Sequence, residues 1–220
     1  MVGAWGGFEV FAYELLITPN LGALYERFFE QHEHCFNGGR ALELGSGSGQ
    51  AAVEFSRRFP ESDLTCTDLS VLQVKKAVDR VAQAGCRKVS FKVEDALDLS
   101  FPDESFSVVF SLASIKHWPD QVKGLAEAWR VLKPGGYLVV VEVDREAQGD
   151  QIERFIKLWR APAIMMPARY FRRFVLPTGL TEEESLARCE QAGISGASVR
   201  RPEEWPFIYL TARKEDQAGS

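Results

Sequence analysis

The chain has 220 residues, and its 31 acidic and 26 basic side chains give a formal net charge of −5 at pH 7. This length is enough for one well-buried domain with a small lid or insertion. The acidic balance differs from the basic charge distribution of nucleic-acid-binding proteins, so we expect no nucleic-acid partner.

The cysteines and the apolar segments indicate the cellular compartment in which the protein is expected. The four cysteines form no Cys-x-x-Cys pair, and their long, irregular intervals predict free thiols in a reducing environment. Residues 1–11 lack the basic stretch before an apolar core that is typical of a signal peptide. The longest apolar runs are far too short to span a bilayer. We therefore predict a cytoplasmic protein without a membrane span.

Residues 9–30 carry apolar side chains at helical intervals, interrupted by Pro19, which predicts two short helices. Because they precede the first predicted strand, we interpret residues 1–37 as an N-terminal helical cap. Such a segment either folds over a ligand as a lid or serves as a plain packing helix, and the sequence leaves both open. Tyr13 and Tyr25 are the candidates for substrate contact within it.

A stretch with two histidines follows these helices. His32, His34 and Cys35 raise the question of a metal site. Residues two positions apart do not share a helix face, and the neighbouring sequence holds no further cluster of ligands. We therefore interpret the stretch as a solvated helix end and predict no metal ion.

From residue 40 onward, short apolar segments alternate with amphipathic ones. The predicted strands cover residues 40–44, 63–69, 89–93, 107–112 and 137–143, the last after a turn at 133–136. The predicted helices cover residues 50–59, 71–84 and 119–132, with Ser70 as the cap of the second. Strands separated by helices need crossover connections, which predict a parallel sheet with helices on both faces.

The pattern loosens after residue 144. A helix is predicted at residues 150–160, and another, capped by Thr181, at residues 181–192. Two late strands, 197–201 and 206–213, predict a hairpin at one edge of the sheet. The domain is therefore expected to cover residues 38–214, with an insertion or lid at about 150–178 and a tail at 215–220.

The first strand runs into a turn in which Gly45, Gly47 and Gly49 alternate with serines. Glycine in such a turn costs backbone entropy, but it permits positive φ and close approach of a ligand to the main chain. The turn therefore predicts a nucleotide-like ligand. In a parallel sheet such ligands bind at the carboxyl ends of the strands, and Asp68, Asp95 and residues 111–117 occupy such ends.

Two features of the turn bear on which nucleotide binds. The dinucleotide pattern Gly-x-Gly-x-x-Gly would put the third glycine where Gln50 stands. Glu43, just before the turn, would repel a pyrophosphate, but it suits the cationic amino-acid end of a sulfonium or ammonium nucleoside. An NAD(P)-linked oxidoreductase is the less favoured alternative.

Residues 43–49 resemble motif I of class I S-adenosylmethionine-dependent methyltransferases, and residues 67–70 are similar to the acidic second motif of that family. Residues 94–103 match its adenine-contacting region, residues 110–118 the stretch beside the reactive methyl, and residues 130–136 the turn before the fifth strand. The resemblance covers residues 38–145 and is closest to small-molecule and ubiquinone/menaquinone-type enzymes. It implies an α/β fold with a doubly wound, mostly parallel, seven-stranded Rossmann-like sheet whose last strand is antiparallel.

The resemblance also implies S-adenosylmethionine as cofactor and S-adenosylhomocysteine as product. The three glycines would admit the methionine moiety and the ribose, Asp68 would bind the ribose hydroxyls, and Ser111 would line the methionine end. Leu69 would pack on the adenine, while Asp95 and the Ala96 amide would contact its polar edge. With Glu43, the implied cofactor-binding residues are Glu43, Gly45, Gly47, Gly49, Asp68, Leu69, Asp95, Ala96 and Ser111.

Methyl transfer is an in-line displacement in which alignment of the acceptor supplies much of the rate, and a hydroxyl acceptor must also lose its proton. His117 follows the fourth strand and is the candidate general base or acceptor-orienting group, with a structural role as the alternative. Lys116 is interpreted as a solvated lysine or as a contact for an anionic substrate.

Further substrate candidates lie in the segment before the late helix. Arg169 and Tyr170 belong to a basic, aromatic stretch that suits a carboxylate or phosphate, or is an ordinary amphipathic segment with exposed arginines. Met165 precedes it and would line an apolar pocket or simply pack in the core. Residues 111–114 are not the Asn/Asp-Pro-Pro-Tyr/Phe tetrapeptide of amino-methylating nucleic-acid enzymes. The leading hypothesis is therefore methyl transfer to an O, N or C atom of a small molecule, with a non-catalytic S-adenosylmethionine-binding protein as a further alternative.

Overall fold

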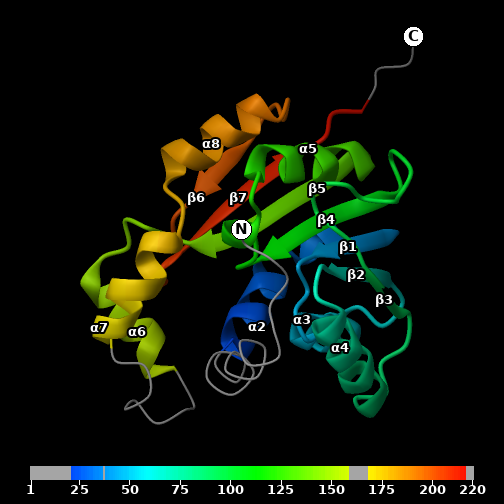
Figure 1. Ribbon diagram of the computed structural model, residues 1–220, viewed down its shortest axis with the longest axis horizontal. Coiled ribbons are helices and arrows are strands. Elements are labelled where there is room, and N and C mark those ends of the chain that lie inside the picture. The colour runs from blue at the N-terminus through cyan, green and yellow to red at the C-terminus, as the bar shows by residue number, and fades with distance from the viewer. Residues whose placement is uncertain (1–20, 37, 159–167, 217–220) are drawn as a thin grey trace.

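A seven-stranded sheet forms the centre of the protein (Figure 1). The computed structural model describes residues 21–36, 38–158 and 168–216, and for Tyr170 the backbone alone. The spatial order of the strands is β3-β2-β1-β4-β5-β7-β6. They are β1 (Arg40–Leu44), β2 (Asp63–Asp68), β3 (Val89–Val93), β4 (Phe106–Leu112), β5 (Leu132–Val143), β6 (Ser198–Arg200) and β7 (Phe207–Arg213).

The first five strands pair in parallel, and β7 pairs antiparallel with both β5 and β6. This confirms the mostly parallel, seven-stranded sheet with a terminal hairpin. The switch point lies at β1, which is flanked by β2 on one side and β4 on the other. In open sheets of this kind, ligands bind beyond the carboxyl ends of the strands at the switch point.

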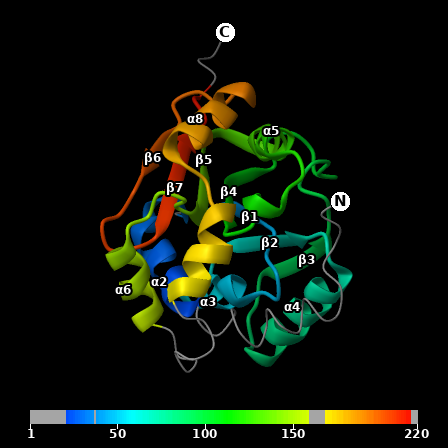
Figure 2. The ribbon, with the colours of Figure 1, turned by 60° about the vertical axis from the view of Figure 1, so that its left-hand side comes forward.

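Helices cover both faces of the sheet, as Figure 2 shows for α5 and α8 above it and α3 and α4 below it. Leu125 and Ala128 of α5 and Cys189 of α8 belong to one core cluster, while Phe55 of α3 and Val81 of α4 belong to the other. The described helices are α2 (Gly22–Gln31), α3 (Gln50–Arg58), α4 (Val71–Gln83), α5 (Gln121–Val131), α6 (Gly149–Lys157), α7 (Ala168–Tyr170), which continues as a π-helical turn (Phe171–Val175), and α8 (Glu182–Gln191).

Side-chain caps fix the starts of three helices, α4, α5 and α8. The Asp120 carboxylate accepts from the Lys123 amide at 2.9 Å. Thr181 and Glu184 form a capping box at α8, and Ser70 Oγ lies 3.5 Å from the Gln73 amide at α4. These contacts satisfy amides that lack partners in the first turn of a helix. The predicted caps Ser70 and Thr181 are therefore confirmed.

The helix α2 packs directly against the sheet. Phe28 and Phe29 are fully buried, and both rings lie within 6 Å of Phe110 on β4. Tyr25, on the same helix, is 8% exposed. The apolar side chains of residues 21–36 are thus part of the main core, while the first of the two predicted helices and Tyr13 lie outside the described residues.

The prediction of a solvated helix end is wrong for His32. Its side chain is 5% exposed, its Nδ1 lies 2.9 Å from Phe28 O, and its ring stacks on Tyr209 of β7 at 5.5 Å between centroids. Burial lowers the pKa of His32, so the neutral imidazole is favoured. The sheet covers this side chain, which periodicity along one helix does not reveal.

The strand β5 begins earlier than predicted. Leu132 already pairs with Phe106, and the next pair is Tyr137 with Val108, so residues 133–136 form a bulge within the strand. Gly135, at φ +76°, donates its amide to Lys214 O at 2.8 Å, and Lys214 returns its amide to Gly136 O at 2.9 Å. The C-terminal end of β7 therefore holds the predicted turn in place. Within the described ranges, no helix combines the length and apolar character needed to cross a membrane.

Candidate functional site

A cavity of about 250 Å³ opens at the carboxyl ends of the central strands. Its walls come from the residues that follow β1, β2, β3 and β4, together with Tyr25 from α2. The cavity brings together most of the predicted site residues, namely Tyr25, Glu43, Gly45, Gly47, Asp68, Leu69, Asp95, Ala96 and His117. The sequence pattern and the topology thus point to the same place.

Hydrogen bonds to the end of β2 shape the glycine-rich turn. The amides of Gly45 and Ser46 both donate to Thr67 O, at 2.8 and 2.9 Å. The Gly47 amide donates to Asp68 Oδ2 at 2.9 Å, and Asp68 Oδ1 accepts from the Ser70 amide at 2.8 Å. Asp68 therefore ties the glycine-rich turn to the start of α4, while its carboxylate still borders the cavity.

The three glycines of the turn serve different purposes, although all have positive φ. A Cβ on Gly45 would lie 1.8 Å from Ser114 Oγ, and a Cβ on Gly49 would lie 2.9 Å from the Cβ of Ala77. A Cβ on Gly47, at φ +52°, would meet no atom within 4 Å and would project into open space. Gly45 and Gly49 are thus required by packing within the protein, and Gly49 does not line the cavity. Gly47 leaves room for a ligand.

Glu43 is the most deeply buried acid in the cavity wall. Its side chain is 2% exposed, and Cys66 Sγ donates to Glu43 Oε2 at 3.4 Å. Burial, with a smaller contribution from the nearby Asp68 charge, raises the pKa of Glu43 from its usual 4.5 to about 7. A cationic ligand group beside this carboxyl would favour its ionised form.

The loop after β3 forms a further wall of the cavity. Asp95 Oδ1 accepts from the Leu97 amide at 2.9 Å, and Glu94 accepts from Ser100. Leu69, across the opening, is 49% exposed and offers an apolar surface to a flat ring. Asp95 retains its second carboxylate oxygen as an acceptor for a donor in the cavity.

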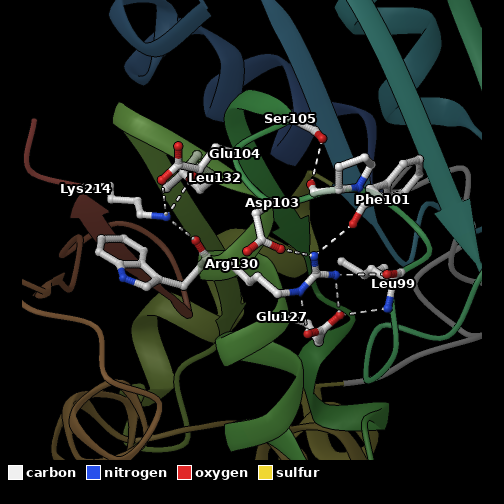
Figure 3. Close-up of polar contacts among 11 residues, drawn as sticks. Leu99, Phe101, Asp103, Glu104, Ser105, Glu127, Arg130, Leu132 and Lys214 are labelled. Atoms are coloured by element: carbon white, nitrogen blue, oxygen red, sulfur yellow. Dashed lines mark hydrogen bonds and ion pairs between the residues drawn. The ribbon is translucent and has the colours of Figure 1, made fainter. Parts of the chain in front are cut away.

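Arg130 of α5 holds this loop in place (Figure 3). Its guanidinium donates to Leu99 O, Phe101 O and Asp103 Oδ1 at 2.7–2.9 Å. It also makes two 2.8 Å bonds to Glu127, whose Oε2 accepts from the Leu99 amide. All five guanidinium N–H groups are thereby used, and the pKa of Arg130 is raised by the Glu127 and Asp103 carboxylates.

The segment after β4 completes the cavity with Ser114, His117 and Trp118. Trp118 Nε1 donates to Ser114 Oγ at 3.3 Å. Burial, reinforced by the Lys116 charge and opposed by Glu142, lowers the pKa of His117 from 6.5 to about 4. His117 is therefore a neutral imidazole at physiological pH.

Two predictions for this segment are corrected. Ser111 is 1% exposed and is not among the residues that line the cavity, where Ser114 stands instead. Residues alternate sides along a strand, and Ser111 points into the protein. Lys116 is neither solvated nor on the cavity wall, because its Nζ lies 2.8 Å from the buried carboxylate of Glu142.

Three polar residues of the cavity that were not predicted from the sequence carry unpaired buried atoms. Ser46 Oγ, Gln50 Nε2 and Gln73 Oε1 are buried and have no hydrogen-bond partner among the described residues. Buried polar atoms are normally paired, so these atoms are suited to hydrogen bonds with a bound molecule. Gln73 could have been found as the polar residue one turn after the Ser70 cap, on the otherwise apolar face of α4.

The remaining substrate candidates are placed only in part. Met165 and the side chain of Tyr170 lie outside the described residues. Arg169 is exposed and does not line the cavity. In the same stretch, Phe171 is buried in the core and Arg172 pairs with Glu153 at 3.2 Å. Among the described residues, no group of three or more His, Cys, Asp or Glu side chains is arranged to hold a metal ion.

Comparison with known proteins identifies a matching domain and related sequences. Residues 42–140 match the family model described as "Methyltransferase domain". The chain is 37% identical over 113 residues to demethylmenaquinone methyltransferase of Deinococcus radiodurans. It is 39% identical over 106 residues to 27-O-demethylrifamycin SV methyltransferase of Amycolatopsis mediterranei. These matches cover 50% and 47% of this chain, and the chain spans only 45% and 38% of the lengths of the two relatives.

The fold has counterparts among solved structures. A SAM-dependent methyltransferase from Aquifex aeolicus aligns with a TM-score of 0.69 and 18% identity, over 95% of this chain and 98% of that chain. This likeness concerns the fold and confirms the Rossmann-like architecture. The matching domain, the two relatives and the motifs around the cavity together support a class I S-adenosylmethionine-dependent methyltransferase domain at residues 42–140.

Proposed function

We propose that this protein transfers a methyl group from S-adenosylmethionine to an O, N or C atom of a small organic acceptor. The observation that carries the proposal is the cavity at the strand ends, where Glu43, Gly47, Asp68 and Asp95 meet. The names of the two relatives describe methyltransferases for demethylmenaquinone and for a demethylrifamycin, which are small organic molecules. Family and cavity therefore support the same reaction class.

The cofactor-binding roles proposed for these residues follow from their chemistry. Asp68 and Asp95 would accept hydrogen bonds from the ribose hydroxyls and the adenine amino group, and Glu43 would face the ammonium of the methionine moiety. The unpaired polar atoms of Ser46, Gln50 and Gln73 are suited to the remaining polar groups of the ligand. When bound, S-adenosylmethionine supplies an electrophilic methyl carbon on a sulfonium.

The charge of the cavity disfavours an anionic acceptor. Of the described residues that line it, Glu43, Asp68, Glu94 and Asp95 are acidic, and none is lysine or arginine. Arg80 of α4 does not line the cavity and donates to Ser48 O and Ser48 Oγ at 3.0 and 2.9 Å. A phosphate or carboxylate on the acceptor would find no cation among the described lining residues, so we infer a phenol, enol or amine substrate without an anionic group.

His117 is proposed to orient the acceptor and to accept its proton. The side chain lines the cavity beside Trp118, and its low pKa keeps the imidazole unprotonated above about pH 5. A neutral imidazole accepts a hydrogen bond from a hydroxyl, which an imidazolium does not. Tyr25 borders the same cavity from α2 and is proposed as a further acceptor contact.

Ligand binding separates the leading proposal from its alternatives. In isothermal titration calorimetry we expect S-adenosylmethionine and S-adenosylhomocysteine to bind with Kd on the order of micromolar, and NAD to give no heat. Incubation with radiolabelled S-adenosylmethionine and a panel of phenols, quinols and amines should then give a methylated product. Binding of NAD without S-adenosylmethionine would point to an oxidoreductase, and binding without turnover on any acceptor to a non-catalytic protein.

Substitution of Gly47 tests where the cofactor lies. Gly47→Ala would put a methyl group into the space left open above the turn, so we expect S-adenosylmethionine affinity to fall at least about tenfold by calorimetry. Gly85→Ala is the matched control, because Gly85 also has a positive φ (+67°) and open space but does not line the cavity. Both variants should lose similar stability, since alanine costs about 1–2 kcal/mol in this conformation. Equal affinities in the two variants would place the ligand elsewhere.

The pH dependence of cofactor binding tests Glu43. Because its pKa in the empty cavity is about 7, the ionised form that attracts an ammonium becomes more populated between pH 5.5 and 7. Linkage predicts that affinity rises about tenfold over this range and that Glu43→Gln is weaker and much less dependent on pH. A wild-type affinity that does not change with pH would contradict this role.

The raised pKa of Glu43 also predicts how this residue affects the stability of the protein. A carboxyl whose pKa is raised by folding destabilises the protein increasingly as pH rises from 4.5 through 7. Glu43→Gln should therefore raise the melting temperature of the empty protein at pH 8 and change it little at pH 4.

Substitution of His117 tests proton acceptance once an acceptor has been found. We expect His117→Gln to lower kcat by about 10²-fold or more, the usual contribution of a positioned base, without weakening S-adenosylmethionine binding. His34→Gln replaces an exposed histidine and should leave kcat unchanged. The kcat of the wild-type enzyme should fall only below about pH 5. If the His117→Gln variant has rates close to those of the wild type at every pH, His117 has no part in the mechanism.

A further inference from the structure

A buried ion pair lies behind the wall of the cavity that follows β4. Glu142 on β5 has a side chain 1% exposed, and Lys116, in the turn after β4, has one 13% exposed. Lys116 Nζ lies 2.8 Å from Glu142 Oε1. Neither residue lines the cavity, so contact with a ligand there does not explain the pair.

Glu142 holds both the side chain and the backbone of Lys116. Glu142 Oε1 accepts from Lys116 Nζ and from the Val143 amide, each at 2.8 Å, while Oε2 accepts from the Lys116 amide at 3.3 Å. A buried carboxylate is costly unless it is both paired and hydrogen-bonded. The turn after β4, in its observed conformation, supplies two of these three contacts, both from Lys116.

Lys116 in turn holds the start of this turn. Its Nζ donates to Ala113 O at 2.7 Å. Ala113 has φ +54°, a left-handed conformation that is unfavourable for alanine. The Ala113 amide donates to Val141 O on β5 at 2.7 Å. Contacts with β5 and with Lys116 thus hold an unfavourable backbone conformation at the rim of the cavity.

His117 directly follows Lys116 and ends the same turn. Its amide donates to Ser114 O at 2.9 Å, closing the 3₁₀ turn Ile115–His117, whose first residue is fully buried. The imidazole reaches the cavity from this short segment. Its position therefore depends on how firmly residues 113–117 are held against β5.

We propose that Lys116 and Glu142 are positioning residues whose ion pair fixes the turn after β4 and so directs the His117 ring into the cavity. This inference rests on the proposed function, because it assigns how the candidate base of that site is held. The described charged groups that act on His117 are Lys116 from its own turn and Glu142 from β5. The cavity carboxylates Glu43 and Asp68 stand on β1 and β2.

The test follows the His117 Cε1–H resonance by NMR, assigned among the three histidines with a His117→Gln sample. Wild-type His117 should not titrate between pH 5.5 and 8, and its resonance should shift when S-adenosylhomocysteine is added. The variant Lys116→Met/Glu142→Gln removes both charges together and leaves no unpaired buried ion. We expect the pKa of His117 to rise by about one unit or more, because the turn opens to water and burial no longer disfavours the charged imidazole, while the losses of the Lys116 and Glu142 charges act on this pKa in opposite directions.

A matched control separates positioning from a general effect of charge. Lys75→Met/Asp79→Asn removes one positive and one negative charge from the exposed face of α4, and His117 should titrate as in wild type. S-adenosylhomocysteine affinity should stay within about threefold in both double variants, since neither pair borders the cavity. A folded Lys116→Met/Glu142→Gln protein with an unchanged His117 pKa and an unchanged shift on ligand addition would overturn the inference.

If the Lys116→Met/Glu142→Gln variant does not fold, hydrogen exchange in the wild-type protein tests the inference instead. The amides of Lys116 and His117 should exchange with solvent as slowly as the core amides of β5, because Glu142 and Ser114 accept from them. Rapid exchange at both positions would show that the turn is not held and would also overturn the inference. A wild-type protein that binds no S-adenosylhomocysteine would instead count against the proposed function, while the pKa and exchange measurements would still test the ion pair.

Discussion

The candidate site depends on one carboxylate that two neighbouring segments share. Asp68, at the end of β2, accepts from the amide of Gly47 through one oxygen and from that of Ser70 through the other. The first contact sets the glycine-rich turn after β1, and the second sets the start of α4. The adjacent Thr67 O also accepts from the amides of Gly45 and Ser46. The end of β2 therefore fixes the conformation of the glycine-rich turn that borders the cavity. Asp68, which we propose to bind the ribose, therefore also stabilises the protein in the absence of a ligand.

Two polar clusters stabilise opposite walls of the same cavity. Arg130 reaches from α5 to the carbonyls of Leu99 and Phe101 and so fixes the loop on the proposed adenine side. Lys116 and Glu142 fix the turn on the proposed acceptor side. The first cluster is partly open to water, and the second is nearly fully buried. Because removal of one partner from a buried pair is far more costly than loss of an exposed one, the acceptor-side turn is the more strongly dependent on its ion pair.

The sheet and most of the cavity could be predicted from the sequence because these features depend on patterns among neighbouring residues. Apolar strands, helix caps such as Thr181 and the positions of Asp68 and Asp95 after strands can all be read within a few residues. What it did not predict depends on contacts between distant segments. His32 is covered by β7, Lys116 pairs with a carboxylate on the next strand, and Gly49 is required by Ala77 on α4. Ser111 was assigned to the cavity, but its side chain is buried on the other side of β4, and Ser114, three residues later, lines the cavity instead.

The central claim is that S-adenosylmethionine lies over the glycine-rich turn with its ribose on Asp68. The most direct test is a crystal structure of the protein with S-adenosylhomocysteine. We predict that the ribose hydroxyls lie within hydrogen-bond distance of the Asp68 carboxylate, with the adenine between Leu69 and the loop at Asp95 and the sulfur facing His117. Density for the ligand in any other part of the molecule, or a ribose that leaves Asp68 uncontacted, would contradict the account.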